Sequence, residues 1–235
     1  MDAVRFSLVT GGNRGLGLEF VRQLLARGDR VAATAREPGR ATALNALAGE
    51  HPGKLRVLPL DVADPRSITA LATELPLAGG SSPLDLLVNC AGVLHSGERF
   101  GSLDPAILED SFRVNALGPL LLTEALAPVL ADGARVANIS SILGSIASLG
   151  RFGTPGYAVG KAAQNMVTAL LAKALADRGI VVVALHPGWA RTEMGGANAT
   201  VEVADSVAGM LRVIDAAGPA DSGTFRDWQG QALPW

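Results

Sequence analysis

The sequence predicts a doubly wound α/β fold, in which helices cover both faces of a parallel sheet of about seven strands. Short aliphatic runs alternate with longer segments of helical period, a pattern that is typical of right-handed βαβ units. A glycine-rich turn joins the first aliphatic run to the first helix. No repeat, linker or low-complexity tail interrupts the pattern. We therefore expect one domain, residues 1–235.

The expected strands are short runs rich in valine, leucine and alanine, with the seventh and weakest at the edge of the sheet. They cover residues 4–10, 30–35, 55–60, 84–89, 134–139, 180–185 and 224–228. The expected helices cover residues 15–27, 41–48, 65–75, 104–130, 157–177 and 203–216. Pro119 and Pro128 should bend or shorten the fourth helix, because proline lacks the helical N–H donor.

The composition excludes several classes of protein. With 20 basic and 22 acidic side chains the net charge is −2, which argues against nucleic-acid binding through counterion release. The hydrophobic fraction of 49% argues against disorder. No apolar run approaches the ~18 residues that span a bilayer, and the N-terminus lacks a signal-peptide pattern, so we expect a cytoplasmic protein that binds no membrane.

The cysteine and the histidines predict no metal site. Cys90 is the single cysteine and should be a small buried hydrophobic residue rather than a reactive thiol. His51, His95 and His186 are too scattered to form a metal site. His95 is a candidate for the edge of a substrate pocket.

The segment Thr10 to Gly17, with the sequence TGGNRGLG, is the first candidate site. Glycines let a backbone approach a pyrophosphate, and the free N–H groups of the following helix attract its charge. A tight turn without a ligand is the alternative, but a position between the first strand and the first helix favours phosphate binding. The expected contacts are Gly11, Asn13, Arg14, Gly15, Leu16 and Gly17.

The end of the second strand should select the nicotinamide cofactor. An acidic residue there favours the ribose hydroxyl of NAD, whereas arginine favours the 2′-phosphate of NADP. Arg36 stands at that position and Arg14 adds a second positive charge, although Glu37 competes. Arg36 as a solvated surface side chain is the alternative. The sequence therefore favours NADP(H) over NAD(H).

Tyr157 and Lys161 stand four residues apart, so on a helix they share one face. A neighbouring cation stabilises a phenolate and pulls the pKa of the phenol toward neutral pH, where the phenol can act as an acid or base. An amphipathic helix start with an exposed lysine would have the same spacing. Ser140 and Ser141, however, follow the fifth strand, at the carboxyl edge where ligands of open α/β sheets bind.

Together these motifs resemble the classical short-chain dehydrogenase/reductase family over nearly the whole chain, with its Rossmann-type dinucleotide-binding fold. The resemblance implies a catalytic tetrad of Asn115, Ser141, Tyr157 and Lys161, with Ser141 chosen because the family uses the second serine of the pair. It also implies further cofactor contacts besides the glycine-rich turn, Arg36, Tyr157 and Lys161. These are Asp61, Val62, Asn89, Ala91, Gly92, Pro187, Gly188 and Thr192. Cys90 departs from the family's NNAG motif, where a second asparagine is usual.

The long interval between Ser141 and Tyr157 and the ending Leu233-Pro234-Trp235 are similar to sniffer-like carbonyl reductases and C-factor-like proteins. The resemblance implies that NADPH delivers hydride to an aldehyde or ketone while Tyr157 donates a proton. Ser141 would orient the carbonyl oxygen, Lys161 would hold the ribose, and Asn115 would anchor a water. A signalling protein of the C-factor type that binds NADP(H) is the alternative, and an enzyme that chiefly oxidises alcohols is a third.

Four side chains beside the motifs, Leu143, Phe152, Trp189 and Met194, are expected either to line the substrate pocket or to pack in the core. The small and polar run at 195–200 is either a lid or an ordinary flexible loop. The family resemblance also implies a homodimer or homotetramer, formed through the apolar surfaces of the helices at 104–130 and 157–177.

Overall fold

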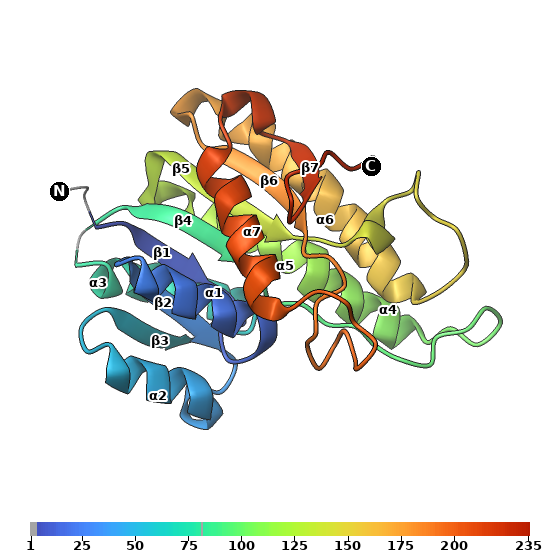
Figure 1. Cartoon of the computed structure of the whole chain (residues 1–235), viewed down its shortest axis with the longest axis horizontal. Helices are drawn as coiled ribbons and strands as arrows, with labels where there is room; N and C mark the ends of the chain where they lie inside the picture. The colour runs from blue at the N-terminus through green and yellow to red at the C-terminus, as the bar shows by residue number, and fades with distance from the viewer. Residues whose placement is uncertain (1–3, 81) are drawn as a thin grey trace.

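A seven-stranded parallel sheet forms the centre of the molecule in the computed structural model, which describes residues 4–80 and 82–235. Its strand order is β3-β2-β1-β4-β5-β6-β7, and every neighbouring pair is parallel. The strands are β1 (Phe6–Val9), β2 (Arg30–Ala35), β3 (Leu55–Pro59), β4 (Leu84–Asn89), β5 (Leu130–Ile139), β6 (Val181–His186) and β7 (Thr224–Asp227). The expected weak strand is indeed an edge strand, and the predicted fold class is confirmed (Figure 1).

Helices cover both faces of this sheet (Figure 1). Apolar side chains of α1 (Gly15–Ala26), α2 (Thr42–Glu50) and α7 (Val203–Ala216) form one core cluster with the strands. Those of α3 (Pro65–Ala78), α5 (Gly118–Leu126) and α6 (Pro155–Ala174) form a second cluster on the other face. The sheet is buried on both sides, which explains why its strands are nearly continuous apolar runs.

The segment expected as one long helix at 104–130 is divided. It comprises α4 (Pro105–Phe112), a π-helical turn Arg113–Leu117, α5 and a short 3-10 turn Ala127–Val129. Pro119 lies in the first turn of α5, where its missing N–H costs least. The amide of Gly118 bonds the carbonyl of Arg113, five residues earlier, so the π turn precedes the proline.

The switch point of the strand order lies between β1 and β4, near the centre of the sheet. Strands β2 and β3 extend the sheet on one side of β1, and strands β5, β6 and β7 extend it on the other side of β4. In doubly wound sheets, ligands bind at the carboxyl ends of the strands flanking such a switch point. The glycine-rich turn follows β1, and Asn89 to Gly92 follow β4, so both motifs meet at this edge. Among the helices that the structure describes, none is long and apolar enough to cross a membrane.

Candidate active site

The glycine-rich turn after β1 is folded tightly against the end of β4. Gly11 and Gly15 have φ values of 66° and 54°, a region that favours glycine. A Cβ atom on Gly17 would lie 2.2 Å from the carbonyl oxygen of Gly11, so only glycine fits there. Thr10 Oγ1 accepts hydrogen bonds from the amides of Cys90 and Ala91, at 2.9 and 3.0 Å. These contacts form a tight backbone cradle at the start of α1.

Two side chains of the turn face solvent. Asn13 and Arg14 are both exposed, and the Arg14 guanidinium forms an ion pair with Glu193 from the segment after β6. Thr192, predicted to contact the nicotinamide, lies near the same turn, with its Cγ2 3.4 Å from where a Cβ of Gly15 would stand. The turn and the segment after β6 are therefore adjacent.

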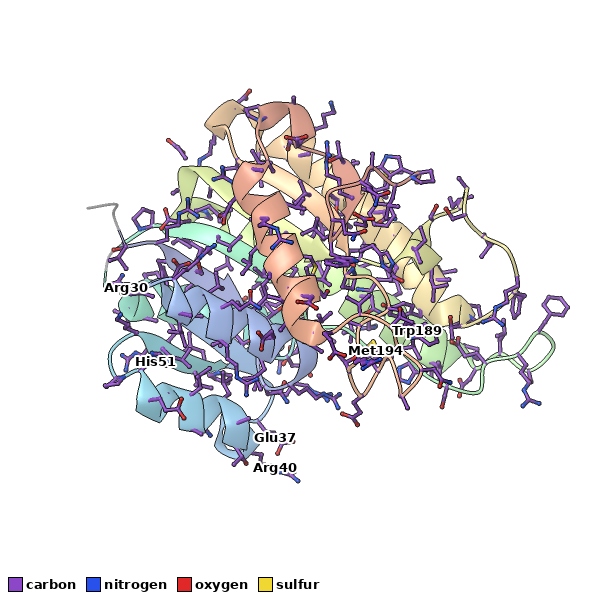
Figure 2. The ribbon with its side chains drawn as sticks, viewed as in Figure 1. Arg30, Glu37, Arg40, His51, Trp189 and Met194 are labelled. Carbon is purple, nitrogen blue, oxygen red and sulfur yellow. The ribbon has the colours of Figure 1, made fainter. Side chains whose placement is uncertain are left out.

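The ends of β2 and β3 hold the residues predicted to contact the adenosine part of a cofactor. Arg36 is exposed at the end of β2, whereas Glu37 is paired with Arg40 at 3.1 Å (Figure 2). Asp61 caps its own turn by accepting a hydrogen bond from Ala63 N at 2.9 Å. Glu37 is thus held by a neighbouring cation, and Arg36 remains accessible.

Asn89 at the end of β4 is 2% exposed, and its amide is used inside the protein. Its Nδ2 donates to Thr123 Oγ1 at 3.2 Å and to Asn138 Oδ1 at 2.8 Å. The side chain ties β4 to β5 and α5. The side chain of Asn89 is therefore engaged within the protein, and its expected contact with a cofactor stays a prediction.

Asn115 lies in the π-helical turn and is fully buried. Its side chain joins this turn to the chain after β4, because Oδ1 accepts from Val93 N at 3.0 Å and Nδ2 donates to Val93 O at 2.9 Å. A Cβ on Gly92 would lie 3.0 Å from Asn115 Oδ1 and 3.7 Å from Lys161 Nζ. Asn115, Gly92 and Lys161 are thus brought together in the structure.

The two serines after β5 have separate partners. Ser140 Oγ donates to Asn165 Oδ1 at 2.6 Å and is buried. Ser141 interacts with the phenol of Tyr157, in the first turns of α6. The structure therefore places Ser141, rather than Ser140, beside the tyrosine.

Lys161 lies one helical turn beyond Tyr157, and its side chain is 4% exposed. Its Nζ stands 5.6 Å from the centre of the tyrosine ring. It donates to Ile139 O at 2.7 Å and to Gln164 Oε1 at 2.9 Å. A buried ammonium with fixed partners thus lies against the phenol, which excludes the exposed lysine of the alternative interpretation.

Burial determines the protonation of this cluster. It raises the pKa of Tyr157 to about 12, although the Ser141 side chain acts in the opposite direction. It lowers the pKa of Lys161 to about 8 and raises the pKa of the Cys90 thiol to about 12. The phenol pKa therefore moves away from neutral pH, opposite to the direction that the Tyr–Lys spacing suggested, because desolvation outweighs the hydrogen bond with Ser141. The protein thus holds a neutral phenol, which can donate a proton.

The segment after β6 begins with Pro187 and Gly188. Pro187 O accepts from Ser206 Oγ at 2.6 Å, which anchors it to α7. Gly188 has a φ of 72°, and a Cβ there would lie 2.9 Å from Trp228 Nε1. This turn directs the following segment back toward the glycine-rich turn.

Four side chains expected to line a pocket or to pack in the core are exposed. They are Leu143, Phe152, Trp189 and Met194, with exposed fractions of 46 to 55%. Core packing is therefore excluded for them. Trp189 Nε1 donates to Gly195 O at 2.8 Å, which folds the segment after β6 on itself (Figure 2).

His95 is paired with Asp110 of α4 at 2.7 Å. Within the described residues there is no group of side chains that could hold a metal ion.

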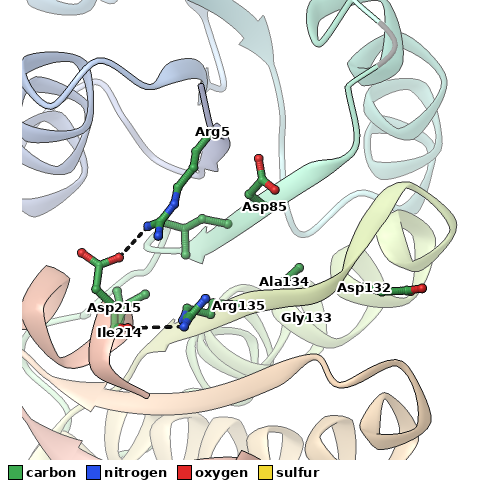
Figure 3. A pocket seen from close by; sticks show the side chains of 9 residues that line it. Arg5, Asp85, Asp132, Gly133, Ala134, Arg135, Ile214 and Asp215 are labelled. Carbon is green, nitrogen blue, oxygen red and sulfur yellow. Dashed lines mark hydrogen bonds and ion pairs between the residues drawn. The ribbon is translucent and has the colours of Figure 1, made fainter. Parts of the chain in front are cut away.

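A pocket at the opposite, amino-terminal edge of the sheet has a volume of about 80 Å³ (Figure 3). Its charged side chains have partners within the protein. Arg5 is paired with Asp215 at 2.8 Å, and Arg135 donates to the Asp215 carbonyl at 3.3 Å. These contacts attach the end of α7 to the sheet, far from Tyr157, and we assign the pocket no binding function.

The sequence reasoning did not identify three residues of the site. Gln164 contacts Lys161, and Glu193 pairs with Arg14. Glu98 Oε1 accepts from Gly156 N at 2.9 Å and so caps α6, whose own N-cap residue makes no side-chain bond. The i, i+3 spacing of Gln164 to Lys161 is a local pattern that could have indicated their contact. No local pattern indicates the role of Glu98, because its partner lies 58 residues away in the sequence.

Comparisons with known proteins agree with this site. A model of the short chain dehydrogenase family matches residues 5–202. C-signal of Myxococcus xanthus is 45% identical over 157 residues, which are 66% of this chain and 95% of that protein. The NADPH-bound carbonyl reductase from chicken fatty liver is 39% identical and has a TM-score of 0.93, with 99% of both chains covered. The carbonyl reductase Sniffer of D. melanogaster is 30% identical, with a TM-score of 0.94 over 99% of this chain and 100% of that one.

The match to the family model spans the glycine-rich turn, the Ser-Tyr-Lys cluster and the segment after β6. The chain therefore belongs to the short-chain dehydrogenase family and is an oxidoreductase.

Proposed function

We propose that this protein reduces an aldehyde or ketone to an alcohol with NADPH. The observation that carries the proposal is the neutral phenol of Tyr157, which is flanked by Ser141 and by the buried ammonium of Lys161. The cluster stands at the sheet edge where the glycine-rich turn opens. The structurally similar chicken enzyme is a carbonyl reductase with bound NADPH, which supports the same chemistry here.

The residues present fit a dinucleotide. The cradle at Gly11 to Gly17 is shaped by its glycines, with no room for a Cβ at Gly17, and the N-terminus of α1 that follows would bind phosphate through its amides. Arg36 and Arg14 would supply positive charge for a 2′-phosphate. When bound, the nicotinamide supplies the hydride to the carbonyl carbon. Ala91 lies against Gly11 of the cradle, Thr192 lies near Gly15, and Gly92 lies near Lys161.

The side chains of the cluster have complementary roles in this proposal. Tyr157 donates its proton to the carbonyl oxygen as negative charge develops there. Ser141 holds that oxygen by a hydrogen bond. Lys161 stabilises the resulting phenolate, whose formation burial disfavours in the protein without coenzyme. Asn115 holds the π turn against the chain after β4 and so keeps the lysine end of the site in place.

The test is NADPH oxidation with a panel of activated carbonyls, followed by absorbance. We expect turnover in the natural protein, and a loss of about 10²- to 10⁴-fold in Tyr157→Phe with NADPH binding retained. Turnover in the Phe variant equal to that of the natural protein would reject the proton-donor role. Absence of turnover with every carbonyl, together with tight NADPH binding, would favour a binding protein.

A signalling role is the second candidate, because C-signal is the relative with 45% identity. That similarity covers 66% of this chain, whereas the match to the chicken reductase covers 99%. The cluster also retains every group that proton transfer needs. Carbonyl reduction is therefore the primary proposal, and the Tyr157→Phe variant distinguishes the two, since a role in binding alone does not require the phenol.

We also propose that two copies pair through α4 and α6. Both helices expose large apolar side chains, namely Phe112, Val159, Met166 and Leu170, with exposed fractions of 44 to 61%. A contact between copies would remove this surface from water. Light scattering should give a multiple of the 24.1 kDa chain mass, and Met166→Glu should reduce it toward the monomer. A monomeric natural protein would overturn this assignment.

A further inference from the structure

Gln164 is a fully buried amide on α6, one turn beyond Lys161. Its Oε1 accepts a hydrogen bond of 2.9 Å from Lys161 Nζ. The orientation of the amide follows from its partner, because an ammonium has donors only and therefore requires the oxygen. The Nε2 of Gln164 is then left without a hydrogen-bond partner among the described residues, although it is buried.

An unpartnered buried donor costs free energy that an apolar side chain of similar size would avoid. Val167 and Leu171, three and seven residues further along α6, pack in the apolar core, so other buried positions on this side of the helix hold apolar side chains. Among the described residues, the side chain of Gln164 makes one hydrogen bond, which is the bond to Lys161. That bond is therefore what distinguishes glutamine from leucine at this position.

The helical turn that carries Gln164 is also held firmly. Thr168 Oγ1 donates to the Gln164 carbonyl at 3.0 Å and accepts from Asn138 Nδ2 at 2.9 Å. Asn138 is in turn bonded to Asn89, so the chain of hydrogen bonds runs from β4 through β5 to α6. These bonds act on the backbone of the turn, so they can be removed without removing the side-chain acceptor for Lys161.

We propose that Gln164 is a positioning residue that keeps the side chain of Lys161 charged and in place beside Tyr157. A neutral carbonyl oxygen stabilises the ammonium without cancelling its charge, whereas a carboxylate would neutralise the attraction that the phenolate needs. With Ile139 O as the second acceptor, two of the three ammonium donors have partners among the described residues. The catalytic part of this inference depends on the proposed reductase function.

The pKa of Lys161 cannot fall much further if this side chain is to stay protonated at physiological pH. Burial lowers its pKa to about 8. The titratable groups that face it are Tyr157 and Cys90, and burial raises the pKa of both to about 12, so both are neutral at physiological pH. Two hydrogen-bond acceptors, Gln164 Oε1 and Ile139 O, contact the ammonium directly and favour its charged form.

The test uses the NADPH-free protein and measures the pKa of Lys161 directly by NMR of its side chain. The chain has only two other lysines, Lys54 and Lys173, so substitution of both by arginine isolates the signal. We expect Gln164→Leu to lower the pKa of Lys161 by about one unit, a tenfold loss of proton affinity, and Gln164→Glu to raise it. Thr168→Val is the control, because it loosens the same helical turn but leaves the acceptor, and it should leave the pKa unchanged.

Steady-state rates supply the second readout. In Gln164→Leu the basic limb of the pH profile of kcat/KM should move to lower pH with the lysine pKa, while Thr168→Val should keep the natural profile. An unchanged lysine pKa in the Leu variant would overturn the proposal, and Gln164→Met provides the same comparison if the Leu variant does not fold. If no carbonyl is reduced by the natural protein, the reductase function fails while the NMR result still decides the role of Gln164.

Discussion

The guanidinium of Arg14 forms an ion pair with the carboxylate of Glu193, and this contact joins the glycine-rich turn to the segment after β6. Both side chains are exposed, at 64% and 78%. Glu193 therefore occupies one of the two cations that we propose for the 2′-phosphate of NADPH. A bound phosphate must compete with this carboxylate for Arg14.

Removal of the competing charge should tighten coenzyme binding. We expect Glu193→Gln to lower the Kd for NADPH by about two- to fivefold, because exposed ion pairs are weak, and the difference should shrink at high salt. Glu202→Gln is the matched control, since Glu202 pairs with Arg191 in the same region at 2.6 Å. Fluorescence titration measures both variants. A Kd that rises in Glu193→Gln would show that the pair assists binding.

Arg36 should determine the preference between NADPH and NADH. Arg36→Asp removes a positive charge and adds a group that repels the 2′-phosphate, so the ratio of the two Kd values should shift toward NADH by about ten- to a hundredfold. Arg40→Asp makes the same change of charge on a side chain that is paired with Glu37. We expect a much smaller shift there. Equal shifts in the two variants would show that the overall charge of this region, and not a contact of Arg36 with the 2′-phosphate, sets the coenzyme preference.

Tyr157 is the only tyrosine of the chain, so its ionisation can be followed by tyrosinate absorbance. Burial raises its pKa to about 12, whereas an ordinary tyrosine has a pKa of about 10. The folded protein should therefore show almost no tyrosinate at a pH of about 10, while protein unfolded in urea should be half ionised there. Because the folded state holds this proton more tightly, the free energy of unfolding should fall as the pH rises from about 10 to about 12. Half ionisation of the folded protein near its ordinary pKa would contradict the burial of the phenol.

The close approach of Gly17 to Gly11 predicts a severe effect of one methyl group. A Cβ at Gly17 would lie 2.2 Å from the Gly11 carbonyl oxygen, so Gly17→Ala must displace the turn. We expect a loss of about 1–3 kcal/mol in the free energy of unfolding and a large loss of NADPH binding. Gly49→Ala in α2 meets no atom of the described residues within 4 Å and should be neutral or stabilising. Denaturant unfolding and coenzyme titration compare the two, and equal stabilities would refute the steric argument.

Glu98 should affect the helix that carries Tyr157. Its carboxylate caps Gly156 N, and its second oxygen has no partner among the described residues, as is true of Ser111 Oγ nearby. Glu98→Ala should destabilise the protein by about 1 kcal/mol, the usual effect of losing a helix cap, and reduce kcat/KM. Glu98→Gln keeps an acceptor for Gly156 and should retain both properties. Thermal unfolding and steady-state rates test this, and a Gln variant as impaired as Ala would point to the charge instead.

The local sequence was sufficient for most of the secondary structure. Strands Arg30–Ala35 and Leu84–Asn89 and helix Val203–Ala216 have the predicted bounds, because continuous apolar runs and helical periodicity are local signals. Strand β5 begins at Leu130 rather than at residue 134, and the helix before it contains a π turn. Pairing with β4, which includes a register shift between Leu84 and Leu86, accounts for the longer strand, and no local pattern encodes such pairing.

The sequence by itself determined the order of the strands and helices, the glycine-rich turn and the helical spacing of Tyr157 and Lys161, since each depends on neighbours along the chain. Only the tertiary structure decided the protonation of that pair, because desolvation depends on what distant segments cover. The same is true of the contacts of Glu98, Asn89 and Glu193, whose partners lie far away in the sequence. Long-range packing thus sets the desolvation of the Tyr157–Lys161 pair and the hydrogen-bond and ion-pair partners around it.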